Sequence, residues 1–221
     1  MLSPAMQDYL KAIYRLQAQD GVVFTSALAT AMKVRAASAT GMVKKLAKMK
    51  LVRHNPYQGV VLSNAGQKMA LEVIRHHRLL ELYLAKALGY SWDQVHAEAE
   101  RMEHVISEEF EEKIFEALGR PIWDPHGEPI PAKDGTLRVP RHDRLADLKP
   151  GTKGTIRQVS EPTAEMLRYL GSRGLVPDVP VKVLERAPFN GPVTIKRGKT
   201  SHVLGRDLAR HIRVETVPDN A

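Results

Sequence analysis

The residues best suited to chemistry in this sequence are histidines and carboxylates in its middle third. They form a pair and a later group of four: His77 and Glu81, then His96, Glu100, Glu103 and His104. On a helix each residue turns by about 100°, so the pair shares one face and the group of four falls within roughly one third of the circumference. Groups this close repel or desolvate one another unless a cation joins them. The spacing therefore favours a metal site over the alternative, a solvated acidic face.

The kind of metal follows from the ligand types. The chain has no cysteine, so a thiolate site is excluded and only imidazole nitrogen and carboxylate oxygen remain. Such a set favours a hard or borderline divalent ion, and we expect Mn²⁺ first, with Fe²⁺ possible. Zn²⁺ remains an alternative, because affinity alone follows the Irving–Williams order and does not select manganese.

Charge is distributed unevenly along the 221 residues, whose net charge is +8. Residues 1–63 hold nine Lys/Arg against two Asp/Glu, whereas residues 64–118 hold six against eleven. A basic amino-terminal part indicates a polyanionic partner such as nucleic acid. No signal-peptide core and no apolar run of membrane-spanning length is present. We therefore expect a cytoplasmic protein with no membrane association.

The basic part has the element order of a winged helix-turn-helix. Apolar spacing predicts helices over 8–16, from 25 to about 32, and over about 36–49, with Thr25-Ser26 able to cap the second. Two β-prone runs, 51–53 and 60–62, flank a turn and would form the wing. The third helix would enter the major groove, with Arg35 just before it. Candidate DNA contacts are Ser38, Thr40 and Gly41 for bases, and Lys44, Lys45 and Lys48 for phosphates. The alternative is a protein-binding three-helix module.

The rest of the chain predicts two further domains and a connection. Helices are expected over 64–88, from about 92 and from 107, and their excess of apolar residues indicates a homodimer interface. Residues 120–151 are rich in proline and suggest a linker. Short alternating strands over 155–159, 181–184, 193–196 and 212–215, with a helix over 164–171, predict a small SH3-like β-barrel, which could bind a proline-rich segment. The fold class is mainly α, with domains at 1–63, 64–119 and 152–217.

Four motifs together resemble the diphtheria-toxin-repressor and manganese-transport-regulator family of metal-dependent repressors. They are DYLKAIY (8–14), RHHRLLELYL (75–84), VHAEAERMEH (95–104) and the segment after 151. The resemblance covers nearly the whole chain. It implies a winged helix-turn-helix, a helical metal-binding and dimerisation domain, and an SH3-like domain. It also implies that a divalent metal acts as corepressor for binding of the dimer to operator DNA.

The resemblance also implies ligand sets. The primary site maps to Asp8, Glu100, Glu103 and His104. The ancillary site maps to His77, Glu81, His96, Glu161 and, less directly, Glu165. Carboxylates at positions 8 and 100, where the iron branch has Met and Cys, resemble the manganese branch. Two departures stand out. Lys11 replaces a Glu of the manganese branch, which leaves open whether this chain forms that branch's binuclear metal centre. Gly41 replaces a base-contacting Gln of the iron branch.

The functional prediction is a manganese- or iron-dependent transcriptional repressor without enzymatic activity or a small organic substrate. One alternative is a metal-independent winged-helix regulator, whose DNA binding a chelator would leave unchanged. The other is a metallohydrolase that uses the His/Glu cluster. Against it, the sequence has no evident general base outside the ligand set, and the basic helix-turn-helix would be unexplained.

Overall fold

The computed structural model describes residues 2–55, 58–160 and 162–217. The chain divides into two compact units, each described by itself below. The first comprises the residues up to His77, together with Glu100–Glu111 and Pro131–Leu137. The second comprises Arg78–Ala99, Glu112–Ile130 and the chain from Arg138 onward. Within the described ranges, no helix is long and apolar enough to cross a membrane.

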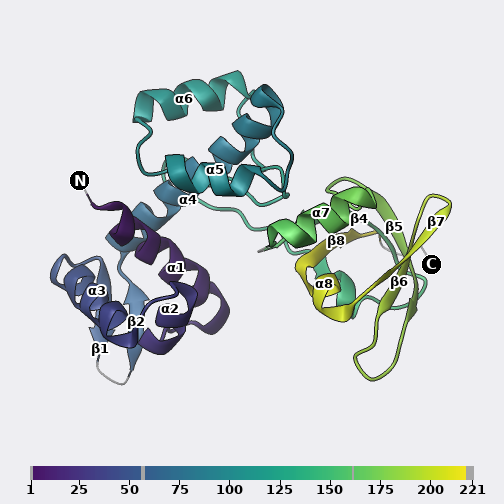
Figure 1. The fold of residues 1–221 in the computed structure, drawn as a ribbon, viewed down its shortest axis with the longest axis horizontal. Helices are drawn as coiled ribbons and strands as arrows, with labels where there is room; N and C mark the ends of the chain where they lie inside the picture. Colours follow the sequence, from purple (N-terminus) through teal and green to yellow (C-terminus); the bar gives the residue numbers. More distant parts are fainter. Residues whose placement is uncertain (1, 56–57, 161, 218–221) are drawn as a thin grey trace. The chain divides into compact units, whose positions relative to one another are not determined.

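The first unit begins with the predicted helix-turn-helix (Figure 1). Its helices are α1 (Pro4–Asp20), α2 (Thr25–Ala31) and α3 (Ala36–Lys48). Leu10 and Ile13 of α1, Leu28 of α2 and Leu46 of α3 are fully buried in one hydrophobic cluster. Full burial of each such side chain contributes roughly 1.5–3 kcal/mol. The cluster therefore ties α1 to α3, the helix predicted to bind DNA.

The wing is a two-stranded antiparallel hairpin of β1 (Val52–Asn55) and β2 (Gly59–Leu62), with Val52 opposite Leu62. Part of its predicted turn, at 56–57, lies outside the described residues. Val23, between α1 and α2, bridges to Val60 of β2. The Gln17 side chain accepts a hydrogen bond from the Leu62 backbone N–H at 2.8 Å. These contacts attach the wing to the helices.

Three helices follow: α4 (Asn64–Leu88), α5 (Val95–Met102) and α6 (Glu108–Ala117). The length of α4 is as predicted. The prediction for α5 was wrong at both ends, because residues 92–94 form a turn and the helix stops at Met102. Glu103 and His104 therefore lie in the turn after α5, and the expected single helical face does not hold all four groups.

The proline-rich segment has little regular structure, as predicted, but residues 124–131 are not a solvent-exposed linker. Asp124, His126 and Ile130 are buried. Gly127 has φ +79°, and a Cβ there would collide with the carbonyl oxygen of Arg157. The Val159 N–H donates to the His126 carbonyl at 2.9 Å. The segment thus packs against the carboxy-terminal sheet. The sequence had suggested that an SH3-like domain could bind such a proline-rich segment.

That sheet has six antiparallel strands in the order β3-β8-β4-β5-β6-β7. The strands are β3 (Asp143–Arg144), β4 (Lys153–Val159), β5 (Pro180–Arg186), β6 (Val193–Arg197), β7 (Thr200–Leu204) and β8 (Ile212–Thr216). Helices α7 (Ala164–Ser172) and α8 (Arg206–His211) and the short helix η1 (Leu145–Asp147) accompany it. The elements β3, β7, α8 and η1 were not predicted from the sequence. Because β3 and η1 lie at 143–147, the folded region begins before position 152.

A smaller correction concerns α2. Thr25 is its first residue, its N-cap is Phe24, and no side chain caps it. Thr25-Ser26 therefore does not cap this helix. At the carboxyl end of α2, the Val34 N–H donates a hydrogen bond to the Ala29 carbonyl at 3.0 Å, and Lys33 adopts φ 54°. A tight turn therefore follows α2.

Candidate metal centre

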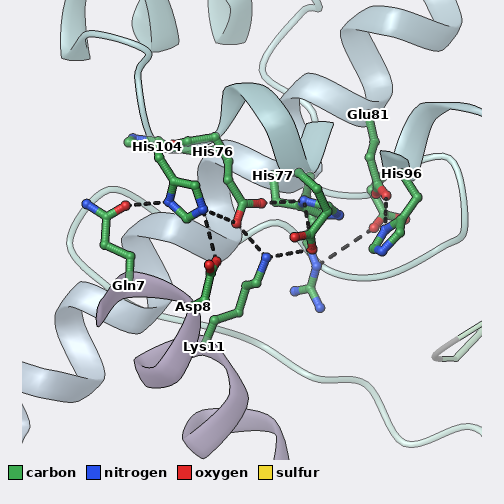
Figure 2. Close-up of polar contacts among 12 residues, drawn as sticks. Gln7, Asp8, Lys11, His76, His77, Glu81, His96 and His104 are labelled. Atoms are coloured by element: carbon green, nitrogen blue, oxygen red, sulfur yellow. Dashed lines mark hydrogen bonds and ion pairs between the residues drawn. The ribbon is translucent and has the colours of Figure 1, made fainter. Parts of the chain in front are cut away.

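The centre in the first unit begins on α1. Tyr9, Leu10 and Ile13 turn one side of this helix into the hydrophobic cluster. Gln7, Asp8 and Lys11 point from α1 toward His104 and the neighbouring side chains (Figure 2). The packing of α1 thus determines where these polar groups lie.

Asp8, Glu103 and His104 offer three ligand atoms that all lie within 4.8 Å of one another. The His104 Nε2 atom is 2.9 Å from Asp8 Oδ1 and 3.4 Å from Glu103 Oε1. Glu103 is buried, and the other two are half-buried. Because two carboxylates and an imidazole converge here from α1 and the turn after α5, the arrangement can hold a small cation.

The orientation of the His104 ring indicates which nitrogen would face that cation. Its Nδ1 lies 2.5 Å from the Gln7 side-chain oxygen, which only accepts hydrogen bonds, so Nδ1–H is the donor. In the neutral ring, Nε2 then carries a lone pair directed toward Asp8. The buried Asp8 Oδ1 has no hydrogen-bond partner among the described residues. Two acceptor atoms 2.9 Å apart fit a shared metal ion.

Lys11 is the second notable group. Its side chain is 5% exposed, and its Nζ atom lies 2.7 Å from Glu100 Oε1 and 2.5 Å from Glu103 Oε1. The ammonium therefore bridges two of the predicted ligands. Glu100 is thus engaged with Lys11 in this structure, and it is not part of the three-residue cluster around Asp8.

Two histidines of α4 surround Glu103. His77 Nδ1 lies 2.5 Å from Glu103 Oε2, and His76 Nδ1 donates to the Glu103 backbone carbonyl at 3.1 Å. His76 Nε2 also donates to Glu111 at 3.0 Å. With acceptors at both nitrogens, the imidazolium is favoured: burial opposes it, but the bonds to Glu111 and to the Glu103 carbonyl raise the pKa of His76. Neither a role for His76 nor one for Gln7 was predicted.

Burial and the neighbouring charged groups have opposing effects on the pKa values of Asp8 and Glu111. Burial raises the pKa of Asp8, and the nearby Glu103 and Glu100 charges act in the same direction, while His104 and Lys11 lower it. At Glu111, burial is likewise unfavourable to the charge. Hydrogen bonds from His76 and Arg75 nevertheless lower the pKa of Glu111 from 4.5 to about 2. Glu111 thus connects α6 to α4 as an anion at neutral pH.

The second unit contains another cluster. Glu81 Oε1 lies 3.0 Å from His96 Nδ1 and 3.7 Å from His126 Nε2. Glu81 and His126 are buried, and His126 contacts the Trp92 ring with centroids 5.7 Å apart. A carboxylate oxygen between two imidazoles has the ligand types of a second cation site. Glu81 and His96 were predicted as ligands of the ancillary site, whereas His126 was not predicted.

His126 is positioned by a turn that Asp124 organises. One Asp124 oxygen accepts from the backbone N–H groups of His126 and Glu128, each at 2.8 Å. Burial, together with the nearby Glu81 and Glu128 charges, raises the pKa of Asp124 well above its ordinary value, although Arg78 opposes this. A signal was available in the sequence, since Asp-Pro-His-Gly combines a potential ligand with residues that form tight turns.

The remaining predicted ancillary residues lie in different places. His77 belongs to the first unit, whereas Glu81 and His96 belong to the second. Glu165 is exposed in the first turn of α7. Glu161 lies outside the described residues. The full ancillary set therefore stays a prediction.

Most of the DNA-binding candidates lie at exposed positions of α3. Ala39, Val43 and Leu46 form its buried stripe. Arg35, just before the helix, and Ser38, Gly41, Lys44, Lys45 and Lys48 are exposed. Thr40 is half-buried and donates a hydrogen bond to the Ala36 carbonyl at 2.9 Å. The basic side chains are thus available to a polyanion, while the apolar stripe holds the helix in the unit.

Profiles of three known domains match the chain in sequence order. "Iron dependent repressor, N-terminal DNA binding domain" matches residues 1–60. "Iron dependent repressor, metal binding and dimerisation domain" matches 63–132, and "FeoA domain" matches 144–216.

Whole proteins are similar over almost the full length. The iron-dependent repressor IdeR of Mycobacterium leprae is 29% identical, over 95% of this chain and 96% of its own. The diphtheria toxin repressor of Corynebacterium glutamicum is 30% identical, over 95% of each chain. A solved structure described as a manganese-dependent transcriptional repressor in complex with manganese is 38% identical, with a TM-score of 0.89, over 96% of this chain and 100% of its own.

Proposed function

This chain belongs to the diphtheria-toxin-repressor family of metal-dependent transcriptional repressors, and from that premise we propose that a divalent ion held by Asp8, Glu103 and His104 acts as its corepressor. The observation that carries the proposal is the convergence of these three ligands within 4.8 Å, from α1 and from the turn after α5. The protein then binds operator DNA of metal-homeostasis genes as a homodimer.

The packing of the first unit supplies a mechanism. When bound, the metal provides the positive charge that joins Asp8 to Glu103 and His104. Asp8 lies on α1, whose Leu10 and Ile13 share a buried cluster with Val43 and Leu46 of α3. Fixing α1 therefore restricts α3, and in a homodimer it restricts the placement of both recognition helices on the operator. Metal binding would shift the equilibrium between the DNA-binding arrangement of the dimer and its other arrangements. The size of the shift would be set by the difference in metal affinity between them.

We propose Mn²⁺ as the effector, with Fe²⁺ as the alternative. Carboxylate oxygen and imidazole nitrogen are the donors at the centre, and the chain has no cysteine to favour a softer ion. The relatives named for iron and the similar structure named for manganese leave both ions in consideration. Operator binding titrated with Mn²⁺, Fe²⁺, Zn²⁺ and a chelator tests the order directly.

A second metal site is proposed at Glu81, His96 and His126, supported by the shared Glu81 oxygen and the burial of two of the three groups. His77, Glu161 and Glu165 stay in the proposal as further ligands. Replacing His126 by alanine should lower the amount of metal bound per protomer and retain the ion at Asp8. An unchanged amount in a folded His126→Ala protein would contradict this site.

A regulatory and non-catalytic role, in the cytoplasm, completes the proposal. Arg35, Ser38, Thr40, Gly41, Lys44, Lys45 and Lys48 would contact the DNA from α3 and the residue before it. Two assays separate this function from its alternatives. Operator binding that a chelator leaves intact would indicate a metal-independent regulator. Ester or phosphoester hydrolysis that needs Mn²⁺ and His104 would indicate a metallohydrolase.

A further inference from the structure

The Lys11 ammonium lies between two carboxylates at the proposed metal centre. It lies 2.7 Å from Glu100 Oε1 and 2.5 Å from Glu103 Oε1. The Lys11 side chain is 5% exposed and that of Glu103 is fully buried. A buried ammonium is stable only when paired with anions, and a buried carboxylate only when paired with a cation. In the metal-free protein, Lys11 therefore supplies Glu103 with a buried positive charge, and Glu103 and Glu100 supply Lys11 with negative charge.

Glu103 connects this ion pair to the proposed metal site. Its Oε1 atom contacts Lys11 and also lies 3.4 Å from His104 Nε2. Its other oxygen, Oε2, is 2.5 Å from His77 Nδ1. The two sides of Glu103 Oε1 thus define two neighbouring positions for positive charge: one near Asp8 and His104, and one toward Glu100, where the ammonium lies.

We propose that Lys11 is a tethered cation that fills the second of these positions, so that the centre takes one divalent ion and not two. This inference rests on the proposed metal site at Asp8, Glu103 and His104. Lys11 touches carboxylates and not the ion, so it acts by position and charge. Like charges a few ångströms apart in a buried site repel strongly, so a second divalent ion cannot share the space with the ammonium.

The proposal also gives Lys11 a role in the metal-free protein. Lys11 and Asp8 both lie on α1, one helical turn apart. Through Lys11, α1 is already attached to Glu100 and Glu103 before a metal binds. For the attachment of α1, the ion held by Glu103 and His104 would add the contact through Asp8. Loss of the ammonium should therefore make the folded protein more dependent on metal, because Glu103 would have lost a buried counter-charge.

The test counts ions and measures their coupling. All proteins carry Glu81→Gln and His126→Ala, so that the second proposed site does not contribute. Mn²⁺ bound per protomer is measured after equilibrium dialysis, and electron paramagnetic resonance distinguishes an isolated ion from an exchange-coupled pair. With Lys11 present, and in the charge-conserving control Lys11→Arg, we expect one ion with an isolated-ion spectrum. Lys11→Glu should bind one additional ion and show the coupled spectrum.

Lys11→Gln is the second variant if Lys11→Glu does not fold without metal. Its melting temperature should rise more on addition of Mn²⁺ than that of the protein with Lys11. A coupled pair in the protein that retains Lys11 would overturn the inference. So would equal ion counts for Lys11 and a folded Lys11→Glu protein. His104→Ala in the same background separates the two proposals. If this variant still binds one Mn²⁺ per protomer, the proposed site at Asp8, Glu103 and His104 is wrong. If it binds none, that site is supported, and the Lys11 variants then test the role of Lys11 alone.

Discussion

His104 Nε2 lies 2.9 Å from Asp8 Oδ1, although Asp8 is on the first helix and His104 follows the fifth. Gln7 holds the other ring nitrogen of His104 at 2.5 Å. The nitrogen that faces Asp8 is therefore an acceptor whenever the ring is neutral. A divalent ion held by both groups would connect α1 to the turn after α5.

Replacement of His104 by alanine should abolish metal-dependent operator binding and leave the fold intact. The reason is that the variant removes one of three converging ligands and cannot hold the ion against α1. Fluorescence anisotropy with labelled operator, with and without Mn²⁺, measures the effect, and circular dichroism checks the fold. The control is His202→Ala on β7, in the other unit. Operator binding by His104→Ala with unchanged metal dependence would contradict the assignment.

Replacement of Gln7 by leucine should weaken Mn²⁺ binding without removing a ligand. Groups that orient a metal-bound imidazole typically account for about 10–100-fold in affinity. Without the acceptor at Nδ1, the His104 ring loses its preferred tautomer and orientation. Isothermal titration calorimetry on Gln7→Leu gives the ratio, and Gln7→Glu should retain much of the affinity because it keeps an acceptor. Equal affinities for the leucine variant and the original protein would show that Gln7 does not orient the ring.

Replacement of Glu111 by glutamine should destabilise the first unit by about 3–5 kcal/mol at neutral pH, because Arg75 and His76 would lose a buried counter-charge. The pKa of Glu111 falls from 4.5 to about 2 on folding. A depressed carboxyl pKa stabilises the fold above the unfolded value, and this stabilisation is lost as pH falls from about 4.5 toward about 2.

Urea denaturation of both proteins, at neutral pH and at acid pH, checks this sign. The difference in free energy of unfolding between the original protein and Glu111→Gln should shrink within that acid window. Glu116→Gln, at an exposed position of the same helix, is the matched control and should change little. If the difference in free energy of unfolding stays constant as pH falls from about 4.5 toward about 2, Glu111 does not titrate as the structure indicates.

Replacement of one exposed lysine of α3, such as Lys44, should weaken binding to all DNA sequences alike. Each phosphate contact contributes about 0.9 to the slope of log affinity against log salt concentration, so the slope should fall by up to about that amount. Thr40→Ala should instead alter the preference among operator variants at nearly constant slope. Salt titrations on a panel of operators measure both. The reverse pattern would mean that α3 docks on DNA in another orientation.

The local sequence pattern was sufficient to predict many of the helices and strands of this protein. The apolar spacing of α1 and α3 predicted these helices because each buries one stripe, and a stripe is visible in sequence. The many apolar residues of α4 predicted that helix, whose middle is buried on nearly all sides. The wing, four of the six strands and α7 were predicted in the same way. The His and carboxylate groups of 96–104 indicated a metal, although the single helical face assumed for them was wrong. Asp8, by contrast, entered only through the family resemblance, since a lone aspartate on an amphipathic helix carries no local signal.

Tertiary structure decided which of these groups meet. The end of α5 at Met102 turns Glu103 and His104 toward Asp8, and packing of α1 brings Lys11 to Glu100 and Glu103. His126 reaches Glu81 because the Asp124 turn packs on the sheet, although the sequence suggested a linker. Sequence periodicity reports which face of an element is apolar. It does not report which polar groups, distant along the chain, burial of those faces brings within bonding distance, because that depends on how the elements pack together.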